Sequence, residues 1–293
     1  MSASPTPSDS ARKFHNFPGA HYVLPSDEPE RDRLDRQHRV LKRAYDDKLV
    51  WAPVDLVPGS AVLDCGTGTG IWLLDLADQV PDGVQLRGID VQSHLFPPPR
   101  SNVKFTTSSV TTLPSEWSSK FQLVHQRLLT LALTASEWPT AFLEMKRVLA
   151  PGGWVQSEET GAGPLSWEAG PATARFQDLA YKLNASRGHM WDSALYIPGF
   201  LADAGFTNIR TEVREIPLGK WAGKEGCEAR DNLIDVFRAA KEPVLNGGGY
   251  GYVNTGEDYD RFIADLVDEW DNTPGAKWNF TIFSAQKPAS QAV

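Results

Sequence analysis

The sequence predicts an α/β fold with a mainly parallel sheet, and three observations indicate it. Short apolar segments typical of strands alternate with segments of helical periodicity between residues 61 and 157. A glycine-rich loop, residues 66–70, separates the first strand from its helix. The 293 residues include 41% hydrophobic and 23% charged side chains, as in ordinary globular proteins. We expect a single domain with insertions, which binds ligands at the carboxyl ends of its strands.

The elements follow in chain order. A charged run from Glu28 to Leu49 has helical spacing and predicts an amphipathic helix before the core. The five strands expected next are 61–64, 85–90, 102–105, 121–125 and 154–157. Helices are expected at 72–80 and 138–149, and Pro151, Gly152 and Gly153 end the second.

The regular alternation of strands and helices ends after the fifth predicted strand. A mixed region over 160–200 predicts a lid, and a strand at 208–216 follows it. Helices at 233–240 and 259–270 precede a last strand at 280–284. We therefore divide the chain into a disordered tail (1–20), an N-terminal helical cap (21–50), a cofactor-binding core (51–160) and a C-terminal part of the same domain with substrate-cap insertions (161–293).

Composition and charge bear on partners and compartment. The formal net charge is −8 and no Lys/Arg cluster is long enough to follow a phosphate backbone, which argues against nucleic acid as a partner. Cys65 and Cys227 cannot form a disulfide framework or a metal site, so no metal is expected. No segment has the length of apolar sequence that a membrane helix or signal peptide requires. These features predict a cytoplasmic or nucleocytoplasmic protein; a homo-oligomer is compatible with the sequence but not predicted.

The strongest chemical signal is VLDCGTGTG, residues 62–70. Glycines allow such a loop to turn sharply and approach a ligand closely. A dinucleotide site is one interpretation, because Asp90 ends the next strand 20 residues after Gly70. Two details oppose it: Ile71 stands where the third glycine of that fingerprint belongs, and Asp64 precedes the loop. A carboxylate there would repel a pyrophosphate but attract the cationic amino group and sulfonium of S-adenosylmethionine.

The chain also resembles a known family. LDCGTGTGIWLLDLA, GIDVQSHLFPPPRSNVKF, FQLVHQRLL and LEMKRVLAPGGWVQSEE are similar to the successive motifs of class I methyltransferases. YVLPSDEPERDRLDRQH, WAPV, GFTNIRTEVREIPLGKW and SAQKP resemble the LaeA-like group of filamentous fungi, so the likeness runs from about Tyr22 to Pro288. It implies a Rossmann-like sheet whose last strand is antiparallel, and S-adenosylmethionine as the cofactor.

The resemblance also assigns cofactor contacts. The loop residues Asp64, Gly66, Thr67, Gly68 and Gly70 would hold the methionine and ribose portions. Asp90 would accept both ribose hydroxyls, and Val91 and Gln92 would flank the adenine. Ser108 and Ser109 stand where the family usually has an acid for the adenine amino group, and an uncharged acceptor binds less firmly.

Candidates for catalysis and substrate binding are less specific. His125 ends the fourth strand and is the candidate general base and a cofactor neighbour. Tyr22 and His38 belong to the N-terminal signature and are expected to close over the cofactor, while Glu159 and His189 are expected to line the pocket. Five tryptophans could together form an aromatic pocket, namely Trp138, Trp154, Trp167, Trp191 and Trp221. Trp138 and Trp154 are expected to pack in the core instead. Trp167 and Trp191, in the expected lid, are the better candidates for the pocket.

Three functions compete at this point. The first is an enzyme that N- or O-methylates a small natural product of fungal secondary metabolism. The second is a methyltransferase-fold regulator or scaffold, which would lack a deep acceptor pocket, whereas an enzyme would enclose a cavity beside the sulfonium. The third, a NAD-dependent oxidoreductase, is disfavoured by Asp64 and by the missing third glycine.

Overall fold

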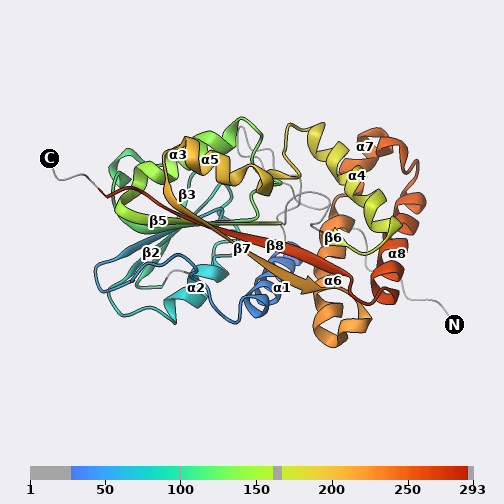
Figure 1. Cartoon of the computed structure of the whole chain (residues 1–293), viewed down its shortest axis with the longest axis horizontal. Coiled ribbons are helices and arrows are strands. Elements are labelled where there is room, and N and C mark those ends of the chain that lie inside the picture. The colour runs from blue at the N-terminus through green and yellow to red at the C-terminus, as the bar shows by residue number, and fades with distance from the viewer. Residues whose placement is uncertain (1–27, 99, 161–166, 290–293) are drawn as a thin grey trace.

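A computed structural model describes residues 28–98, 100–160 and 167–289 (Figure 1). The predicted tail and Tyr22 lie outside these residues. The described chain forms a sheet in the order β3-β2-β1-β4-β5-β8-β6, with β7 also paired to β8. The strands are β1 (Ala61–Cys65), β2 (Gln85–Asp90), β3 (Val103–Thr107), β4 (Phe121–Arg127), β5 (Leu149–Thr160), β6 (Trp167–Glu168), β7 (Thr207–Pro217) and β8 (Lys277–Gln286).

The direction of the strands confirms the predicted sheet. Strands β1 to β5 pair in parallel, and β8 runs antiparallel to β5, β6 and β7. In β1 and β4 most side chains are buried on both faces, because helices cover both faces of a parallel sheet. The carboxyl ends of β1, β2 and β4 therefore meet at one edge, which bears the glycine loop and Asp90.

Helices cover the sheet from both sides. Helix α2 (Ile71–Ala77) packs Leu73 and Leu76 into the core on one face. Helices α3 (Glu137–Val148) and α5 (Ile197–Asp203) belong to the core on the other face, to which Trp138 contributes (Figure 1). The predicted core role of Trp138 and Trp154 is confirmed, since both are buried.

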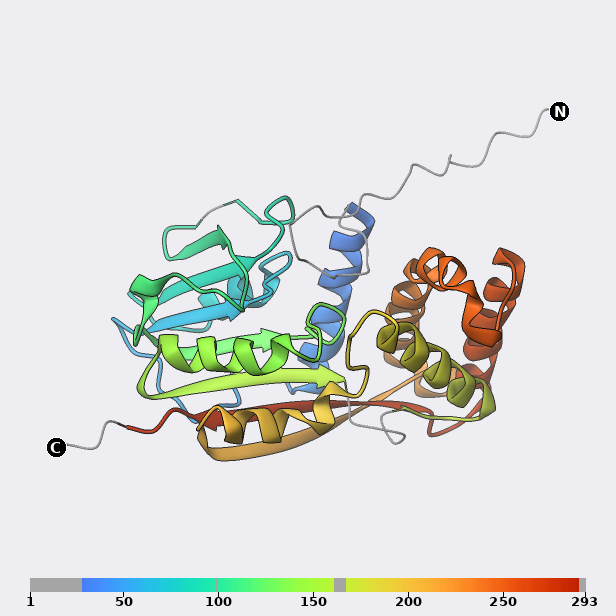
Figure 2. The same cartoon turned by 90° about the horizontal axis from the view of Figure 1, so that it is seen from above.

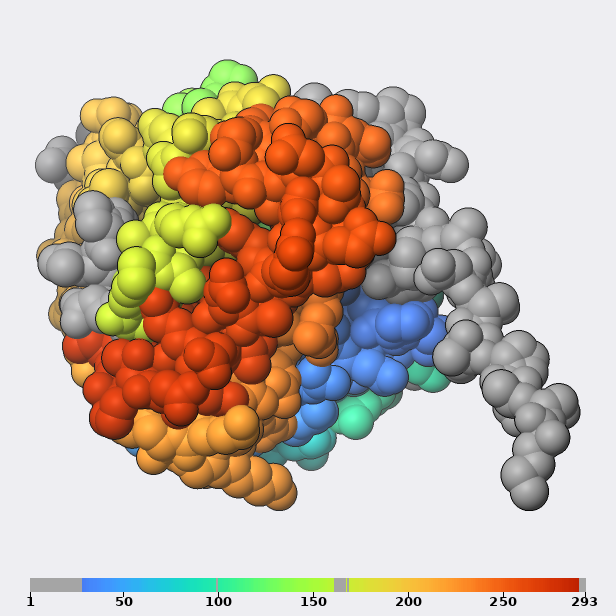
Figure 3. All heavy atoms as spheres, turned by 90° about the vertical axis from the view of Figure 1, so that its right-hand side faces the viewer, coloured from blue at the N-terminus to red at the C-terminus, as the bar shows by residue number. Residues whose placement is uncertain are grey.

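A helical cap lies at one end of the sheet, and α1 (Glu28–Ala44) lies between this cap and the sheet (Figure 2). The cap consists of α4 (Pro171–Ala185), α6 (Gly223–Ala239), α7 (Lys241–Asn246) and α8 (Gly256–Asn272), which share an apolar core with Trp167 and the first half of β8. In space-filling view α1 (blue) adjoins the orange cap segment that includes α6 (Figure 3).

Some boundaries differ from the prediction. The first helix ends at Ala44, five residues before the expected end, and β5 begins at Leu149 instead of residue 154. Pro151 and the two glycines stop helix α3, but they lie inside β5, where its register with β4 shifts. The region expected to form a lid divides in two, because α4 joins the cap whereas α5 packs against the sheet.

Candidate functional site

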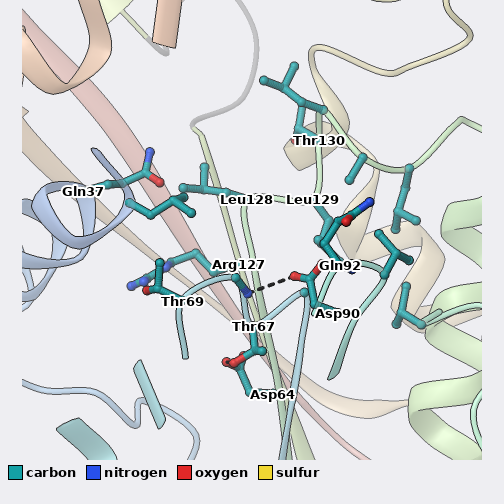
Figure 4. Close-up of a pocket in the computed structure, with 18 of the residues that line it drawn as sticks. Gln37, Asp64, Thr67, Thr69, Asp90, Gln92, Arg127, Leu128, Leu129 and Thr130 are labelled. Carbon is teal, nitrogen blue, oxygen red and sulfur yellow. Dashed lines mark hydrogen bonds between the residues drawn. The ribbon is translucent and has the colours of Figure 1, made fainter. Parts of the chain in front are cut away.

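A cavity of about 680 Å³ opens at the carboxyl ends of β1, β2 and β4 and extends beneath α1 and α6 (Figure 4). This volume lies in the range of small-molecule sites. Its lining comes first from α1 (Glu30, Arg33, Leu34, Gln37) and from the glycine loop with its flanks (Asp64, 66–69, Ile71, Trp72). The end of β2 (90–92, Leu95) and the segment after β3 (108–112) follow. The remaining residues come from β4 and the segment after it (His125, 127–133, Glu137) and from the end of β5 and the cap side (Thr160, Trp167, Trp191, Leu233, Val236, Phe237, Trp278).

The glycines of the loop are required by its backbone conformation and by close packing. Gly66, Gly68 and Gly70 all have positive φ, of 70°, 52° and 73° respectively, which disfavours any other residue. A Cβ at Gly66 would lie 2.6 Å from the side chain of Leu129. Positive φ and this close contact explain why glycine stands at these positions, while Gly66 and Gly68 also line the cavity.

Asp90 is built into the same loop. Its Oδ2 accepts the backbone N–H of Gly68 at 2.9 Å, and its Oδ1 accepts that of Gln92 at 3.0 Å. Burial raises the pKa of Asp90 above its ordinary value. Each carboxylate oxygen can accept a second hydrogen bond, so Asp90 can hold two adjacent hydroxyl groups.

His125 lies between two buried carboxylates. Its Nδ1 is 2.7 Å from Asp64 Oδ1, its Nε2 is 3.2 Å from Glu158 Oε1, and its ring stacks on Trp72 with centroids 3.8 Å apart. Burial alone would lower the pKa of His125, but the charge of Glu158 and the hydrogen bond to Asp64 raise it. Protonated His125 therefore donates from both nitrogens.

Asp64 is engaged twice within the protein. Besides Asp64 Oδ1 beside His125, Asp64 Oδ2 accepts the hydroxyl of Thr67 at 2.6 Å. The sequence placed this carboxylate against a cationic ligand. In the structure it lines the cavity, but its hydrogen bonds fix the glycine loop to β4.

Helix α1 lies over the glycine loop. The Thr69 hydroxyl donates to Asp35 at 2.8 Å, and Leu34 lies 3.5 Å from the position of a Cβ at Gly68. Glu30 and Arg33 form an ion pair with two hydrogen bonds, of 2.8 and 2.6 Å, and both line the cavity. These contacts close the cavity on its α1 side with charged and polar groups.

The opposite part of the cavity is apolar and aromatic. The turn after β4 contributes Leu128 and Leu129, and the cap contributes Phe237. Trp167 and Trp191 face this part as expected, with ring centroids 6.1 Å apart. Trp221 does not join them, since it is 40% exposed and its indole N–H donates to the carbonyl of Leu218.

Three residues predicted to line the pocket, His38, Glu159 and His189, lie behind its lining instead. Gly70, a predicted cofactor contact, also does not line the cavity. His38 bonds Asp75 and Arg127, and burial together with the Arg127 charge lowers the pKa of His38 to about 4. Burial raises the pKa of Glu159 to about 7, although its carboxylate accepts hydrogen bonds from the Leu129 N–H and the Thr130 hydroxyl. His189 is buried and its backbone bridges to that of Thr134.

The remaining predicted residues do line the cavity. They are Asp64, Gly66, Thr67, Gly68, Asp90, Val91, Gln92, Ser108, Ser109, His125, Trp167 and Trp191. Sequence reasoning missed the cavity face of α1, although Glu30, Arg33 and Gln37 have the i, i+3, i+7 spacing of one helix face. It also missed Arg127, Phe237 and Trp278, because no local pattern indicates that these segments meet.

Comparison with known proteins agrees with this fold. Residues 62–153 match the family described as "Methyltransferase domain". The N-methyltransferase sirN of Leptosphaeria maculans is 32% identical over 290 residues, covering 94% of this chain and 97% of that protein. The secondary metabolism regulator LAE1 of Cochliobolus heterostrophus is 26% identical, covering 73% and 71% of the two chains. A chain in the complex of the Haloferax volcanii Trm112 methyltransferase activator with a methyltransferase has the same fold, with a TM-score of 0.50, 17% identity and coverage of 89% and 95%.

Fold, glycine loop and relatives together define the class: the chain belongs to the class I S-adenosylmethionine-dependent methyltransferases. Within that class it belongs to the fungal group associated with secondary metabolism, and it methylates small molecules. The predicted resemblance and cofactor are confirmed, and this membership replaces the dinucleotide interpretation.

The described residues contain no helix long and apolar enough to cross a membrane. They also contain no group of three or more potential metal ligands, and both cysteines within them are free thiols.

Proposed function

We propose that this protein transfers the methyl group of S-adenosylmethionine to a nitrogen atom of a neutral, largely apolar small molecule. One observation carries the proposal: a single cavity joins the polar lining around Asp90 to an aromatic lining beneath the cap. The likeness to sirN, an N-methyltransferase, supports nitrogen as the acceptor atom. We also propose that residues 51–160 hold the cofactor while α1 and the insertions after residue 160 enclose the acceptor.

The cavity residues fit the cofactor. Asp90 offers two carboxylate oxygens to a ribose diol, and the backbone of Gly66 and Gly68 lines the cavity beside it. Val91 supplies an apolar surface beside the adenine, and Ser109 supplies a hydroxyl acceptor for its amino group. When bound, the cofactor supplies an electrophilic methyl group on a positively charged sulfur.

The aromatic part of the cavity indicates the character of the acceptor. Trp167 and Trp191 line it, together with Phe237 from α6 and Trp278 from β8. Trp167, Phe237 and Trp278 are themselves buried, so they form a packed aromatic wall. Flat organic molecules gain apolar burial and ring contacts from such walls. A charged acceptor would lose hydration there, so a neutral one is favoured.

The contribution of His125 follows from its two partners. Because both ring nitrogens face carboxylates and the pKa is raised, His125 holds its protons and is not available as a general base. We infer that it holds Asp64 and Glu158 in place beneath the reacting groups. Catalysis then relies on alignment of acceptor and methyl group and on exclusion of water by the cap.

The experiment uses the purified protein, cofactor carrying a ¹³C-labelled methyl group, and matched acceptors that differ in a single atom. A planar apolar secondary amine or amide, its oxygen analogue and its N-methylated form are compared by carbon NMR of the product. The expected result is a new N–¹³CH₃ signal with the nitrogen acceptor alone. Label on oxygen, or binding of S-adenosylhomocysteine without transfer to any member of a broad acceptor panel, would contradict the proposal and favour a regulator or scaffold.

We further propose that the protein works in the cytosol or nucleocytoplasm without nucleic acid or membrane partners. The two free thiols, Cys65 and Cys227, suit a reducing compartment. A net charge of −8 opposes binding to a phosphate backbone.

A further inference from the structure

Strand β7 forms an edge of the sheet, and within the described residues it pairs with β8 alone. In Figure 2 β7 (gold) lies outside β8 (red), at the lower side of the molecule. An edge strand carries a row of backbone N–H and C=O groups that can pair with a further strand. Most proteins keep such edges short, but β7 has 11 residues. The fold therefore presents a long strand edge to its surroundings.

The middle of this edge exposes an apolar side chain. Val213 is 53% exposed, and its neighbours on the same face of the strand, Thr211 and Glu215, are exposed as well. Helix α5 packs beside β7, and the residues that lead into α5 expose Leu195 and Tyr196. Exposed apolar side chains on neighbouring elements are typical of an interaction surface.

The charges that flank Val213 are complementary to a second copy of the same strand. Charges usually protect an edge, because like charges meet when two identical strands pair. Here Glu212 and Arg214 have opposite signs and lie on the other face of the strand from Val213. In an antiparallel pair centred on Val213, each Glu212 lies opposite Arg214 of the second copy. Glu212 Oε1 is already 3.2 Å from Nη2 of Arg214 in its own strand, so pairing closes a ring of four alternating charges.

Other registers fit less well. An antiparallel pair centred on Glu212 or on Arg214 sets like charges against each other at its centre. A pair centred on Thr211 avoids this repulsion, but it extends across the register shift between Thr207 and Arg210, where the strand is irregular. The register centred on Val213 uses the regular part of the strand and covers the exposed side chain with its own copy.

We propose that two copies of this chain associate through β7, as an antiparallel pair centred on Val213 that joins their two sheets into one. The interface is isologous, because both copies contribute the same patch. Backbone hydrogen bonds along the edge, contact between the two Val213 side chains and the ring of Glu212 and Arg214 hold the pair together. The proposal does not depend on the reaction, since no residue of β7 lines the cavity.

Sedimentation of the purified chain over a range of protein concentrations measures this association. Glu212→Arg sets two arginines against each other on both sides of the axis, and Arg214→Glu does the same with two glutamates. The double variant with both charges reversed restores opposite pairs, and an equimolar mixture of the two single variants forms complementary heterodimers. Lys120→Glu is the matched control, because it makes the same change of charge as Arg214→Glu at an exposed position before β4.

Wild type and Lys120→Glu are expected to dimerise with equal affinity, and each single variant about 10- to 100-fold more weakly, because two repulsive contacts replace two attractive ones. The double variant and the mixture are expected to recover the dimer, which a variant that merely unfolds cannot do. Val213→Lys sets two ammonium groups on the axis and is expected to dissociate the pair as well. A wild type that stays monomeric at every concentration, or single variants that dimerise as wild type does, would overturn the inference.

Discussion

Asp90→Asn tests the cofactor site most directly. The substitution keeps the shape of the side chain but removes its charge and replaces one acceptor oxygen with an NH₂ donor. Each Asp90 oxygen accepts a backbone N–H in the structure, from Gly68 and from Gln92. Whichever oxygen is replaced, one loop N–H then faces a donor, and the ribose diol loses a charged acceptor.

A hydrogen bond to a charged group contributes about 1.5–3 kcal/mol, so the affinity for S-adenosylhomocysteine should fall about 10- to 100-fold. Calorimetric titration at neutral pH measures this loss, and Asp82→Asn, at an exposed turn, is the matched control. The raised pKa of Asp90 adds a pH dependence, because wild-type affinity should decline as pH falls toward that pKa while the variant shows no such decline. An Asp90→Asn protein that binds within about twofold of wild type would refute the assignment of the diol to this carboxylate.

Three further predictions concern stability. The pKa of Glu159 is about 7 in the fold, above its ordinary value, so wild-type stability should fall by roughly 3 kcal/mol as pH rises from about 4.5 to 7. Urea unfolding of Glu159→Gln should lack this slope, whereas Glu137→Gln should keep it. His125→Gln leaves two buried carboxylates without their cation and should lose about 3–5 kcal/mol in the same assay, and a loss below about 1 kcal/mol would contradict the assigned charge. Gly70→Ala should destabilise more than Gly152→Ala: both glycines have φ above 70°, but only at Gly70 would a Cβ meet an aromatic ring, at 2.7 Å. Equal losses of stability in the two variants would contradict this prediction and show that the Phe105 ring moves to make room for the Cβ.

Sequence reasoning placed the glycine loop and Asp90 at one cavity because local patterns encode their positions. The glycine loop must turn with positive φ, and an acid at the end of β2 must reach the same edge of a parallel sheet. The place of Asp90 at this edge followed from its position in the chain, while its proposed contact with the ribose came from the family resemblance. His38 was assigned to the site as part of the N-terminal signature, and His189 and Glu159 were assigned by residue type. Their burial behind the lining follows from packing that neither signal encodes.

The amino-acid sequence by itself determined the alternation of strands and helices, the class of cofactor and the position of the glycine loop, because hydrophobic periodicity and glycine spacing act over a few residues. Only the tertiary structure decided which groups meet across the cavity. Asp64, His125 and Glu158 come from three strands, and their mutual charges set the protonation of the histidine. The cap brings Phe237 and Trp278 to the same cavity from segments far apart in the chain. Such contacts depend on how whole elements pack, and no short stretch of sequence specifies that packing.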